Sequence, residues 1–403
     1  MSLLPLRTRV AGIDRHYDTK VRTRVAGFDL QYSEADVRAI MERFEEVIRS
    51  GFISMGRNVA EFERQWADYC GVKYAVGTAN GTCSLEMILR AIGVQGGTVV
   101  VPSHTFIATA AAAIRAGAKV IFVDCQRETF QMHPEDLRRK IRPDTRAVIL
   151  VHMSGIISPH LDEIRDICER RGVPLVEDAA HAHGATIDAR KAGSLGLAGS
   201  FSFFSTKVIT TGEGGMITTD DQRVYEIARA LRDHGRFGPE PNIHHEIGYN
   251  WRPSEFSAIL GLEQMARVDE ILARRRQIAR TYDEQLKAMK TPGIRLLDIP
   301  ANVQSSYYKY ILYFEPPIER EKLKQILKQE YGVCLPGELY NRDCHTQPVF
   351  GRYPEAVVSQ PKDTLPETEY VVSHHFCLPL YPSLQDEQVD YVVASLDKAV
   401  RCF

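Results

Sequence analysis

This sequence has little excess of charge of either sign, few cysteines close together and no long apolar run. Its 50 basic and 52 acidic residues leave a formal net charge of -2, so no overall field attracts nucleic acid or an anionic membrane. The eight cysteines include no C-x-x-C pair, which predicts neither a zinc site nor a disulfide framework. The alanine-rich run from Ala108 to Ala118 is broken by Arg115 and is well short of the ~20 apolar residues of a membrane span. We therefore expect a cytoplasmic protein that uses neither metal, membrane nor nucleic acid.

The composition is that of a globular protein large enough for more than one domain. Of 403 residues, 44% are hydrophobic and 25% are charged, so a large buried core can form. The first residues, MSLLPLRTRVAG, hold no apolar core of signal-peptide length, and we expect no targeting segment. A local repeat follows, because RTRVAGID at 7–14 returns as RTRVAGFD at 22–29. Two copies are too few for a solenoid, so we predict a duplicated N-terminal arm over residues 1–35.

Alternating apolar and amphipathic segments between about residues 75 and 220 indicate an α/β fold, with a mainly parallel sheet flanked by helices. Two segments, 134–141 and 160–172, place apolar residues at helical spacing, and Gly172 ends the second as a C-cap. The predicted strands are Thr98–Pro102, Lys119–Asp124, Ala147–Met153, Pro174–Asp178, Ser200–Phe204 and Gly215–Thr219.

The last third of the chain has a different pattern. Residues 254–289 keep a helical apolar period without proline, which predicts one or two long helices that lead out of the large domain. A strand pair near 308–314 and a helix from Arg320 to Tyr331 follow, as in a smaller α+β domain. We predict a large domain over residues 36–265 and a small C-terminal domain over residues 266–403.

Open α/β sheets bind ligands at the carboxyl ends of their strands, and three polar groups are candidates for such a site. The first is Asn80-Gly81-Thr82, which precedes a helix. Free backbone N–H groups and the positive end of the helix dipole form an anion site, and Gly81 lets a phosphate approach the backbone closely. The same residues also suit an ordinary N-cap, so both interpretations stay open.

The second group ends the predicted strand at Pro174–Asp178, within VEDAAHAHGA at 176–185. A carboxylate such as Asp178 at a strand end is often a helix cap. Alternatively it pairs with a cationic ring nitrogen, which a pyridoxal-5′-phosphate (PLP) enzyme needs to keep its pyridine protonated. His181 suits either packing or a contact with cofactor or substrate.

The third group contains Lys207, within GSFSFFSTKVITTGEGGMITTD at 199–220. A lone lysine after a strand is usually a solvated charge. Here Phe203, Phe204 and Val208 flank it, and an apolar setting lowers the pKa of a lysine and activates its amine for Schiff-base chemistry. Lys207 is therefore a candidate nucleophile.

Asp178 and Lys207 lie 29 residues apart, within E-D-A-A-H-A-H-G-A and F-S-F-F-S-T-K-x-x-x-T-G-E-G-G-M. On these motifs the chain resembles the sugar aminotransferase family of DegT, DnrJ, EryC1 and StrS type, within the PLP fold-type I superfamily, whose members have a large mixed-sheet domain and a smaller α+β domain. The resemblance covers nearly the whole chain after about residue 30 and includes G-x-x-V-x-x-F-E at 56–63, P-S-x-T-F at 102–106, G-A-K-x-x-F-V-D at 117–124, G-Y-N-W-R at 248–252 and L-P-L-Y at 378–381.

The resemblance implies roles for the candidate residues around the cofactor. Lys207 would hold PLP covalently as an internal aldimine, and Asp178 would pair with the pyridine nitrogen. Phe106 would stack on the ring, with His181 as a further cofactor contact. The phosphate ligands that the resemblance implies are Gly81, Thr82 and Ser202.

It also implies a shared site and two substrate contacts. Asn250, in the G-Y-N-W-R motif, would reach the phosphate bound by the neighbouring subunit, which implies a homodimer. Arg252 of the same motif is a candidate substrate contact. So is His345, because CHTQP at 344–348 resembles the family's H-x-Q-P loop. An ordinary exposed loop histidine is the other interpretation of His345.

The implied reaction has two halves. Glutamate or glutamine gives its amino group to the cofactor, leaving pyridoxamine 5′-phosphate and a keto acid, while Lys207 moves the proton. The pyridoxamine form then aminates a keto sugar, for which we expect a nucleotide-linked 3- or 4-keto-deoxysugar. This chemistry belongs to amino sugar biosynthesis.

Three alternatives remain. VHMSGIISPH at 151–160 departs from the V-H-L-Y-G-[QH]-P segment of many nucleotide-sugar members, which leaves open a cyclitol or other ring ketone of inosose or aminohydroxybenzoate type. A PLP-dependent sugar dehydratase is disfavoured because the well-known ones replace the lysine by histidine, whereas Lys207 is retained. A non-enzymatic regulatory protein would show a degraded site, whereas Asp178, Lys207, Ser202 and Asn250 are all present.

Overall fold

The computed structural model describes residues 24–238, 240, 242–358 and 364–403. The first copy of the N-terminal duplication and the first two residues of the second therefore lie outside the described residues. From Arg24 the arm packs on the C-terminal part of the chain. The backbone N–H groups of Arg24 and Val25 donate to the Gly332 carbonyl at 2.9 and 3.1 Å, and Val25 is buried.

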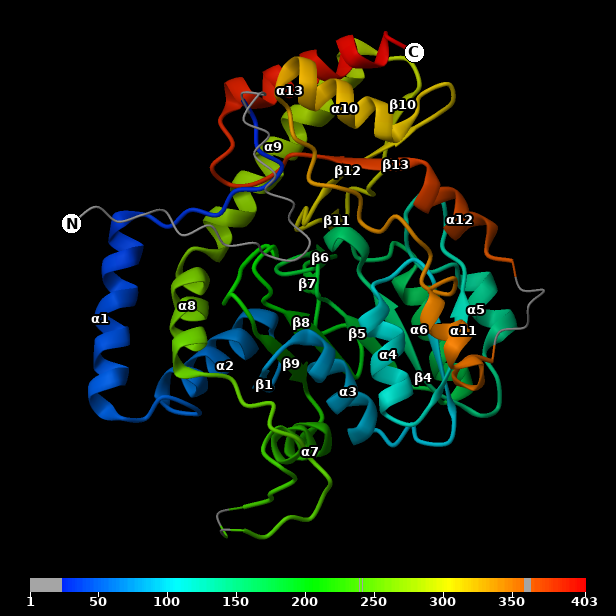
Figure 1. Ribbon diagram of the computed structural model, residues 1–403. Coiled ribbons are helices and arrows are strands. Elements are labelled where there is room, and N and C mark those ends of the chain that lie inside the picture. The colour runs from blue at the N-terminus through cyan, green and yellow to red at the C-terminus, as the bar shows by residue number, and fades with distance from the viewer. Residues whose placement is uncertain (1–23, 239, 241, 359–363) are drawn as a thin grey trace.

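A seven-stranded sheet in the order β1-β9-β8-β5-β4-β2-β3 forms the centre of the molecule (Figure 1). Strands β8, β5, β4, β2 and β3 run parallel to one another, and β9 is antiparallel to both β8 and β1. The predicted α/β fold with a mainly parallel sheet is confirmed, and β1 is a strand that the sequence analysis missed. The strands are β1 (Tyr74–Thr78), β2 (Thr98–Pro102), β3 (Lys119–Val123), β4 (Thr145–Val151), β5 (Leu175–Asp178), β8 (Ala198–Ser202) and β9 (Gly215–Thr219).

Helices cover both faces of this sheet. Successive strand residues point to opposite faces, so Val100 of β2 joins one hydrophobic core while Val99 and Val101 join the other. Helices α2, α5 and α6 contribute to the first core, and α3, α4 and α7 to the second. Their bounds are α2 (Arg57–Cys70), α3 (Gly81–Ala91), α4 (Ile107–Arg115), α5 (Pro134–Lys140), α6 (Leu161–Arg171) and α7 (Gln222–Arg232).

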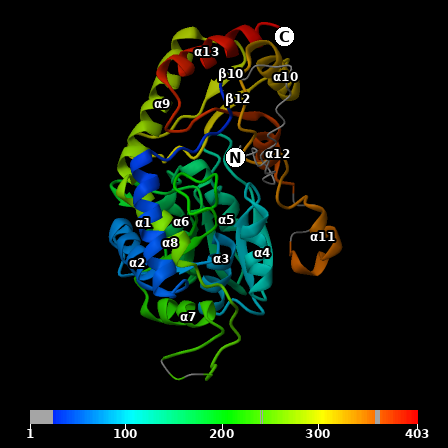
Figure 2. The same ribbon diagram turned by 60° about the vertical axis from the view of Figure 1, so that its left-hand side comes forward.

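Two helices connect the region of the large sheet to the C-terminal part of the chain, as predicted for residues 254–289. Helix α8 (Glu255–Ala266) pairs with α1 (Glu34–Ser50), and α9 (Val268–Met289) runs on to α13 (Figure 2). There a second sheet, in the order β10-β12-β13, packs with α10 and α13 around a separate core. The helix predicted from Arg320 to Tyr331 is α10. The other elements are β10 (Ile294–Leu296), β12 (Tyr310–Phe314), α10 (Arg320–Tyr331), β13 (His375–Leu378) and α13 (Asp386–Val400).

Part of the last third of the chain returns to the large sheet. The Val358 N–H donates to the Val120 carbonyl of the edge strand β3 at 2.9 Å. Within the described residues, no helix combines the length and the apolar character needed to cross a bilayer. The division into domains at residues 35 and 265 remains a prediction. The remaining elements are β6 (Thr186–Ile187), β7 (Arg190–Lys191), β11 (Val303–Gln304), α11 (Pro348–Arg352) and α12 (Pro366–Ser373).

Candidate active site

A cavity of about 720 Å³ lies at the carboxyl ends of the parallel strands. It reaches Val151 at the end of β4, Asp178 at the end of β5 and Ser202 at the end of β8. This is the edge at which open α/β sheets bind ligands. The cavity brings together most of the residues predicted from the sequence, namely Gly81, Thr82, Phe106, Asp178, His181, Ser202 and Lys207.

One end of the cavity is formed by the start of α3. Asn80 caps the helix, because its Oδ1 accepts the Cys83 N–H at 2.9 Å. Gly81 and Thr82, in the same first turn, line the cavity. A Cβ at Gly81 would lie 3.0 Å from Ser202 Cβ, so glycine is what lets α3 approach β8 this closely. The N-cap and the anion site are therefore compatible: the side chain caps the helix while the backbone of the first turn faces the cavity.

Asp178 is a buried carboxylate in the cavity wall. Thr109 Oγ1 donates to its Oδ2 at 2.8 Å, and the Ala180 N–H donates to its Oδ1 at 3.2 Å. Burial raises the pKa of Asp178, and the hydrogen bonds from Thr109 and Ala180 and the positive charge of Lys207 offset this only in part. A cationic ligand group beside Asp178 would restore a low pKa, because opposite charges favour the ionised form.

Lys207 lies in the turn after β8, with Val208 and Ile209 buried behind it. Its Nζ lies 4.7 Å from the ring centroid of Tyr308, within cation–π range. Burial raises the pKa of the Tyr308 hydroxyl, but the charges of Lys207 and Lys309 outweigh burial, so this pKa lies below its usual value. Thr206 Oγ1, 3.2 Å from the Tyr308 hydroxyl, acts in the same direction. The cavity therefore contains a primary amine next to a polarised phenol.

Aromatic rings line a further part of the cavity. His181 stacks on Tyr308 with ring centroids 4.1 Å apart and planes 17° apart. Burial and the neighbouring Lys207 and Lys309 hold the pKa of His181 well below its ordinary value, so the ring is neutral. Tyr340 stacks on Phe106 at 6.0 Å between centroids, and Phe106 is otherwise exposed. These rings offer flat apolar surfaces to a planar ligand.

Three predicted site residues are not part of this cavity lining. Asn250 is exposed and pairs through its backbone with Asp233. Arg252 Nη1 donates to Asp233 Oδ1 at 2.6 Å. His345 is half-buried, with Nδ1 2.6 Å from the hydroxyl oxygen of Ser103. Burial lowers the pKa of His345. Their roles in binding remain predictions.

The site also includes residues in and behind the cavity wall that the sequence analysis did not single out. Thr109 is the hydrogen-bond donor to Asp178, and Tyr308, Tyr340 and Trp251 contribute ring surface. Trp251 lies between Asn250 and Arg252 in the G-Y-N-W-R motif, so its position in the sequence could have indicated that it belongs to the site. Thr109 and the two tyrosines had no such signal, because Thr109 reaches Asp178, and the tyrosines reach the cavity, from distant elements.

The chemical groups that line the cavity fit PLP. A helix start with a glycine cradle suits a phosphate, a buried carboxylate suits a pyridinium, and a primary amine suits an aldehyde. Among the described residues, no group of three or more His, Cys, Asp or Glu side chains is placed to hold a metal ion.

The model of the DegT/DnrJ/EryC1/StrS aminotransferase family matches residues 34–397. The chain belongs to this family. Among its relatives is GDP-perosamine synthase from Caulobacter vibrioides, which is 33% identical over 353 residues and covers 86% of this chain and 91% of that protein. The dTDP-3-amino-3,4,6-trideoxy-alpha-D-glucose transaminase of Micromonospora megalomicea is 31% identical over 375 residues, with 92% and 97% covered.

Solved structures of aminotransferases have the same fold as this family member. DesV of S. venezuelae, in complex with a ketimine intermediate, superposes with a TM-score of 0.86 at 29% identity, covering 94% of this chain and 99% of that chain. Spr1654 of Streptococcus pneumoniae, in its PMP form, superposes with a TM-score of 0.84 at 25% identity, covering 94% of this chain and 100% of that chain. The protein is thus a sugar aminotransferase with the fold of PLP-dependent aminotransferases, as the sequence predicted.

Proposed function

We propose that this protein transfers the amino group of glutamate or glutamine to a keto group on a nucleotide-linked deoxysugar, with PLP bound to Lys207. The observation that carries the proposal is that Lys207, Asp178 and the α3 start with Ser202 line one cavity. The names of two relatives, GDP-perosamine synthase and a dTDP-amino sugar transaminase, support a nucleotide-linked acceptor.

The protein's own residues would divide the work as follows. Gly81, Thr82 and Ser202 bind the phosphate, and Asp178 keeps the pyridine nitrogen protonated. When bound, the cofactor supplies a ring that accepts electron density from the amino donor. Lys207 holds the cofactor through Nζ and, once displaced, its amine moves the proton in both half-reactions.

His181, neutral and stacked on Tyr308, would fix the position of the ring from one side of the cavity. Phe106, on which Tyr340 stacks, would contact the cofactor ring from another side. Because both contacts are aromatic rings, they would cover the faces of the cofactor ring. These ring contacts would add to the positioning by Asp178 and by the phosphate site.

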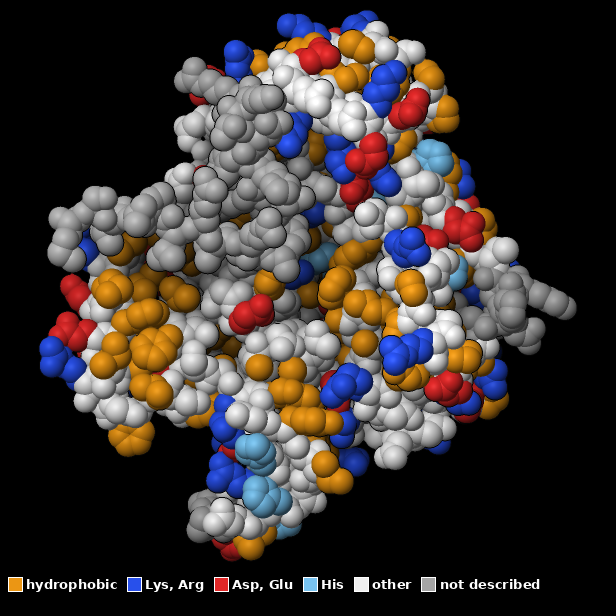
Figure 3. All heavy atoms as spheres, in the orientation of Figure 1, with side chains coloured by type: hydrophobic (Ala, Val, Ile, Leu, Met, Phe, Trp, Pro, Cys, Tyr) orange, Lys and Arg blue, Asp and Glu red, His pale blue; other side chains and the backbone are white. Residues whose placement is uncertain are grey.

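We also propose that the enzyme works as a homodimer. The outer face of α1 leaves Met41 58% and Ile48 64% exposed, and Phe52 beyond its end is 76% exposed. Figure 3 shows hydrophobic side chains gathered over α1 and α8. An apolar patch of this kind favours association with another copy. Asn250, exposed and outside its own cavity, is available to a partner subunit.

Absorption spectroscopy and borohydride trapping test the cofactor assignment. When glutamate or glutamine is added to protein loaded with PLP, the absorbance of the lysine-bound PLP form should fall and that of the pyridoxamine form should rise. Borohydride reduction and peptide mass mapping should place a phosphopyridoxyl group on Lys207, and Lys207→Ala should abolish both results. Label on another lysine, or no half-reaction with either donor, would refute the proposal.

A panel of acceptors tests the second half-reaction. We expect amination of nucleotide-linked 3- or 4-keto-deoxysugars, detected by mass spectrometry of the amino sugar. Activity confined to cyclitol ketones would instead support the alternative acceptor. Light scattering should give a dimer mass, and Met41→Glu should shift it toward the monomer if the exposed face of α1 is the interface.

A further inference from the structure

Irregular backbone forms one wall of the cavity. Residues 334–340 belong to no helix or strand, yet Leu339 and Tyr340 line the cavity. Backbone without a hydrogen-bond ladder takes its position from side-chain contacts or remains free to shift. The placement of Tyr340 therefore depends on what holds this segment.

Lys309 holds one half of the segment. Its Nζ donates to the carbonyl oxygens of Pro336 at 3.3 Å, Gly337 at 3.2 Å and Glu338 at 2.7 Å. Three backbone acceptors match the three donors of an ammonium group. Ser154 holds Lys309 itself, because Ser154 Oγ donates to the Lys309 carbonyl at 2.8 Å.

His375 holds the other half. The Leu339 N–H donates to His375 Nε2 at 3.1 Å, so Nε2 is the acceptor and Nδ1 carries the proton that faces the Val371 carbonyl. His375 is fully buried, and burial lowers its pKa to about 3. The acceptor lone pair on Nε2 is therefore present at neutral pH.

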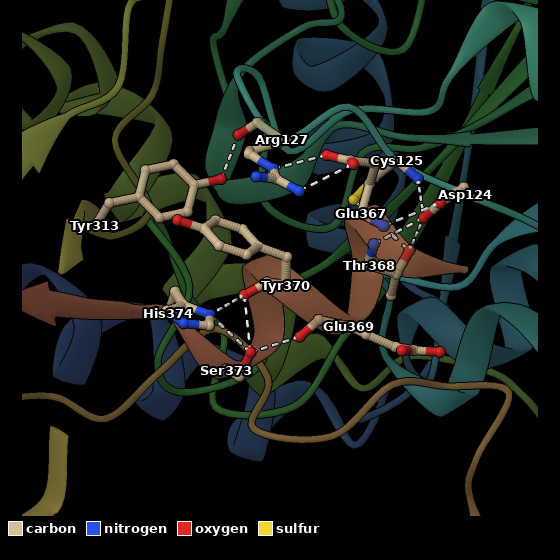
Figure 4. Close-up of polar contacts among 10 residues, drawn as sticks. All are labelled: Asp124, Cys125, Arg127, Tyr313, Glu367, Thr368, Glu369, Tyr370, Ser373 and His374. Atoms are coloured by element: carbon tan, nitrogen blue, oxygen red, sulfur yellow. Dashed lines mark hydrogen bonds and ion pairs between the residues drawn. The ribbon is translucent and has the colours of Figure 1, made fainter. Parts of the chain in front are cut away.

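Helix α12 connects His375 to the large sheet. Val371 belongs to α12, whose first turn is fixed by Asp124, the residue that follows β3 (Figure 4). Asp124 Oδ1 accepts the Thr368 N–H at 2.7 Å, and its Oδ2 accepts the Glu367 N–H at 3.1 Å. The segment that carries Tyr340 is thus connected to the same sheet that carries Asp178.

We propose that Lys309 and His375 are positioning residues that hold residues 336–340 so that Tyr340 forms the acceptor-side wall of the cavity. This inference rests on the proposed function, because it assigns that wall to the sugar. Tyr340 stacks on Phe106, and its hydroxyl lies 3.4 Å from His181 Nε2. A shift of the segment would change the space left for the acceptor while Lys207 and Asp178 stay in place.

The chain offers matched variants. His375→Asn keeps a donor near Val371 but has no acceptor that reaches Leu339, whereas His375→Gln places an amide oxygen near the Nε2 position. His374→Asn is the control, because His374 Nδ1 also meets an α12 carbonyl, that of Tyr370, at 3.0 Å. Lys309→Met removes the ammonium and keeps the stem, and its control is the exposed Lys287→Met.

Amide hydrogen exchange of peptides covering 336–340 and steady-state kinetics measure the effect. In His375→Asn and Lys309→Met we expect exchange about tenfold faster in this segment, equivalent to about 1.4 kcal/mol. We expect about a tenfold higher KM for the keto-sugar acceptor in both variants, and in His375→Asn a smaller than threefold change in kcat and in the KM for glutamate. His375→Gln, His374→Asn and Lys287→Met should stay near wild type.

The proposal is overturned if exchange in 336–340 is unchanged in both variants, or if kcat and both KM values change together in His375→Asn. If His375→Asn does not fold, Lys309→Met against Lys287→Met decides. Should wild-type protein aminate no keto sugar, the proposed function fails, while the exchange data still decide whether Lys309 and His375 hold the segment.

Discussion

Glu177, next to Asp178 on β5, gives the sharpest test of how the site is supported. It is fully buried, and its carboxylate accepts four hydrogen bonds. Leu195 and Gly196 donate to Oε1 at 2.7 and 2.9 Å, while Gly193 and His152 Nε2 donate to Oε2 at 2.7 and 2.8 Å. Three of these donors are in the turn that leads into β8. Glu177 thus joins the strand of Asp178 to the strand of Ser202.

Glu177→Gln replaces one acceptor oxygen with a donor. Whichever way the amide is turned, two of the four donors face an NH₂ group and lose their acceptor. Hydrogen bonds to a charged group are worth about 1.5–3 kcal/mol each, so the free energy of unfolding should fall by about 3–6 kcal/mol. With a urea dependence of about 3 kcal/mol per molar, the midpoint of unfolding should fall by about 1–2 M.

Urea unfolding followed by tryptophan fluorescence is a suitable assay, because Trp66 is fully buried in the core that contains Phe201 and Phe203. Glu226→Gln is the control, since Glu226 is exposed and accepts one hydrogen bond, from Gln222, and should change stability by less than about 0.5 kcal/mol. A midpoint for Glu177→Gln within about 0.3 M of wild type would contradict the four-bond assignment.

Three further predictions concern the cavity and its surroundings. Asp178→Asn should lower kcat about a thousandfold, because a charge pair near 4 Å is worth about 4 kcal/mol at an effective dielectric constant of 20; stopped-flow absorbance measures this, with the exposed Asp188→Asn as control. Gly81→Ala should weaken PLP binding about tenfold to a hundredfold in a titration of apoprotein, whereas Gly351→Ala, where a Cβ meets nothing within 4 Å, should not. Burial lowers the pKa of His183 to about 3 from an ordinary 6.5, so only the unfolded chain gains a proton below pH 6.5. Stability should therefore fall as the pH drops from 6.5 toward 3, by about 1.4 kcal/mol per unit for this histidine, and His183→Phe should reduce that slope in urea titrations.

Local patterns predicted much of the fold because they reflect local physics. Strand β2 and helix α10 have the predicted bounds, since apolar alternation and helical periodicity are properties of a few neighbouring residues. Strand β1 was missed because Gly77 interrupts a five-residue segment, which is too short for a clear period. The long helical segment was predicted as one or two helices, and the break falls at Arg267, which bonds Asp36 of α1 at 2.6 Å. That contact is tertiary and has no local signal.

The sequence by itself determined what kind of enzyme this protein is. The spacing of Asp178 and Lys207 within their motifs was enough for the family, and the strand ends placed both at one edge of the sheet. Only the tertiary structure decided what surrounds them. Thr109 reaches Asp178 from α4, and Tyr308 and Tyr340 reach Lys207 and Phe106 from the last third of the chain. The reason is physical, because periodicity reports which face of an element is buried, whereas contacts between segments far apart in the chain depend on how all the elements pack together.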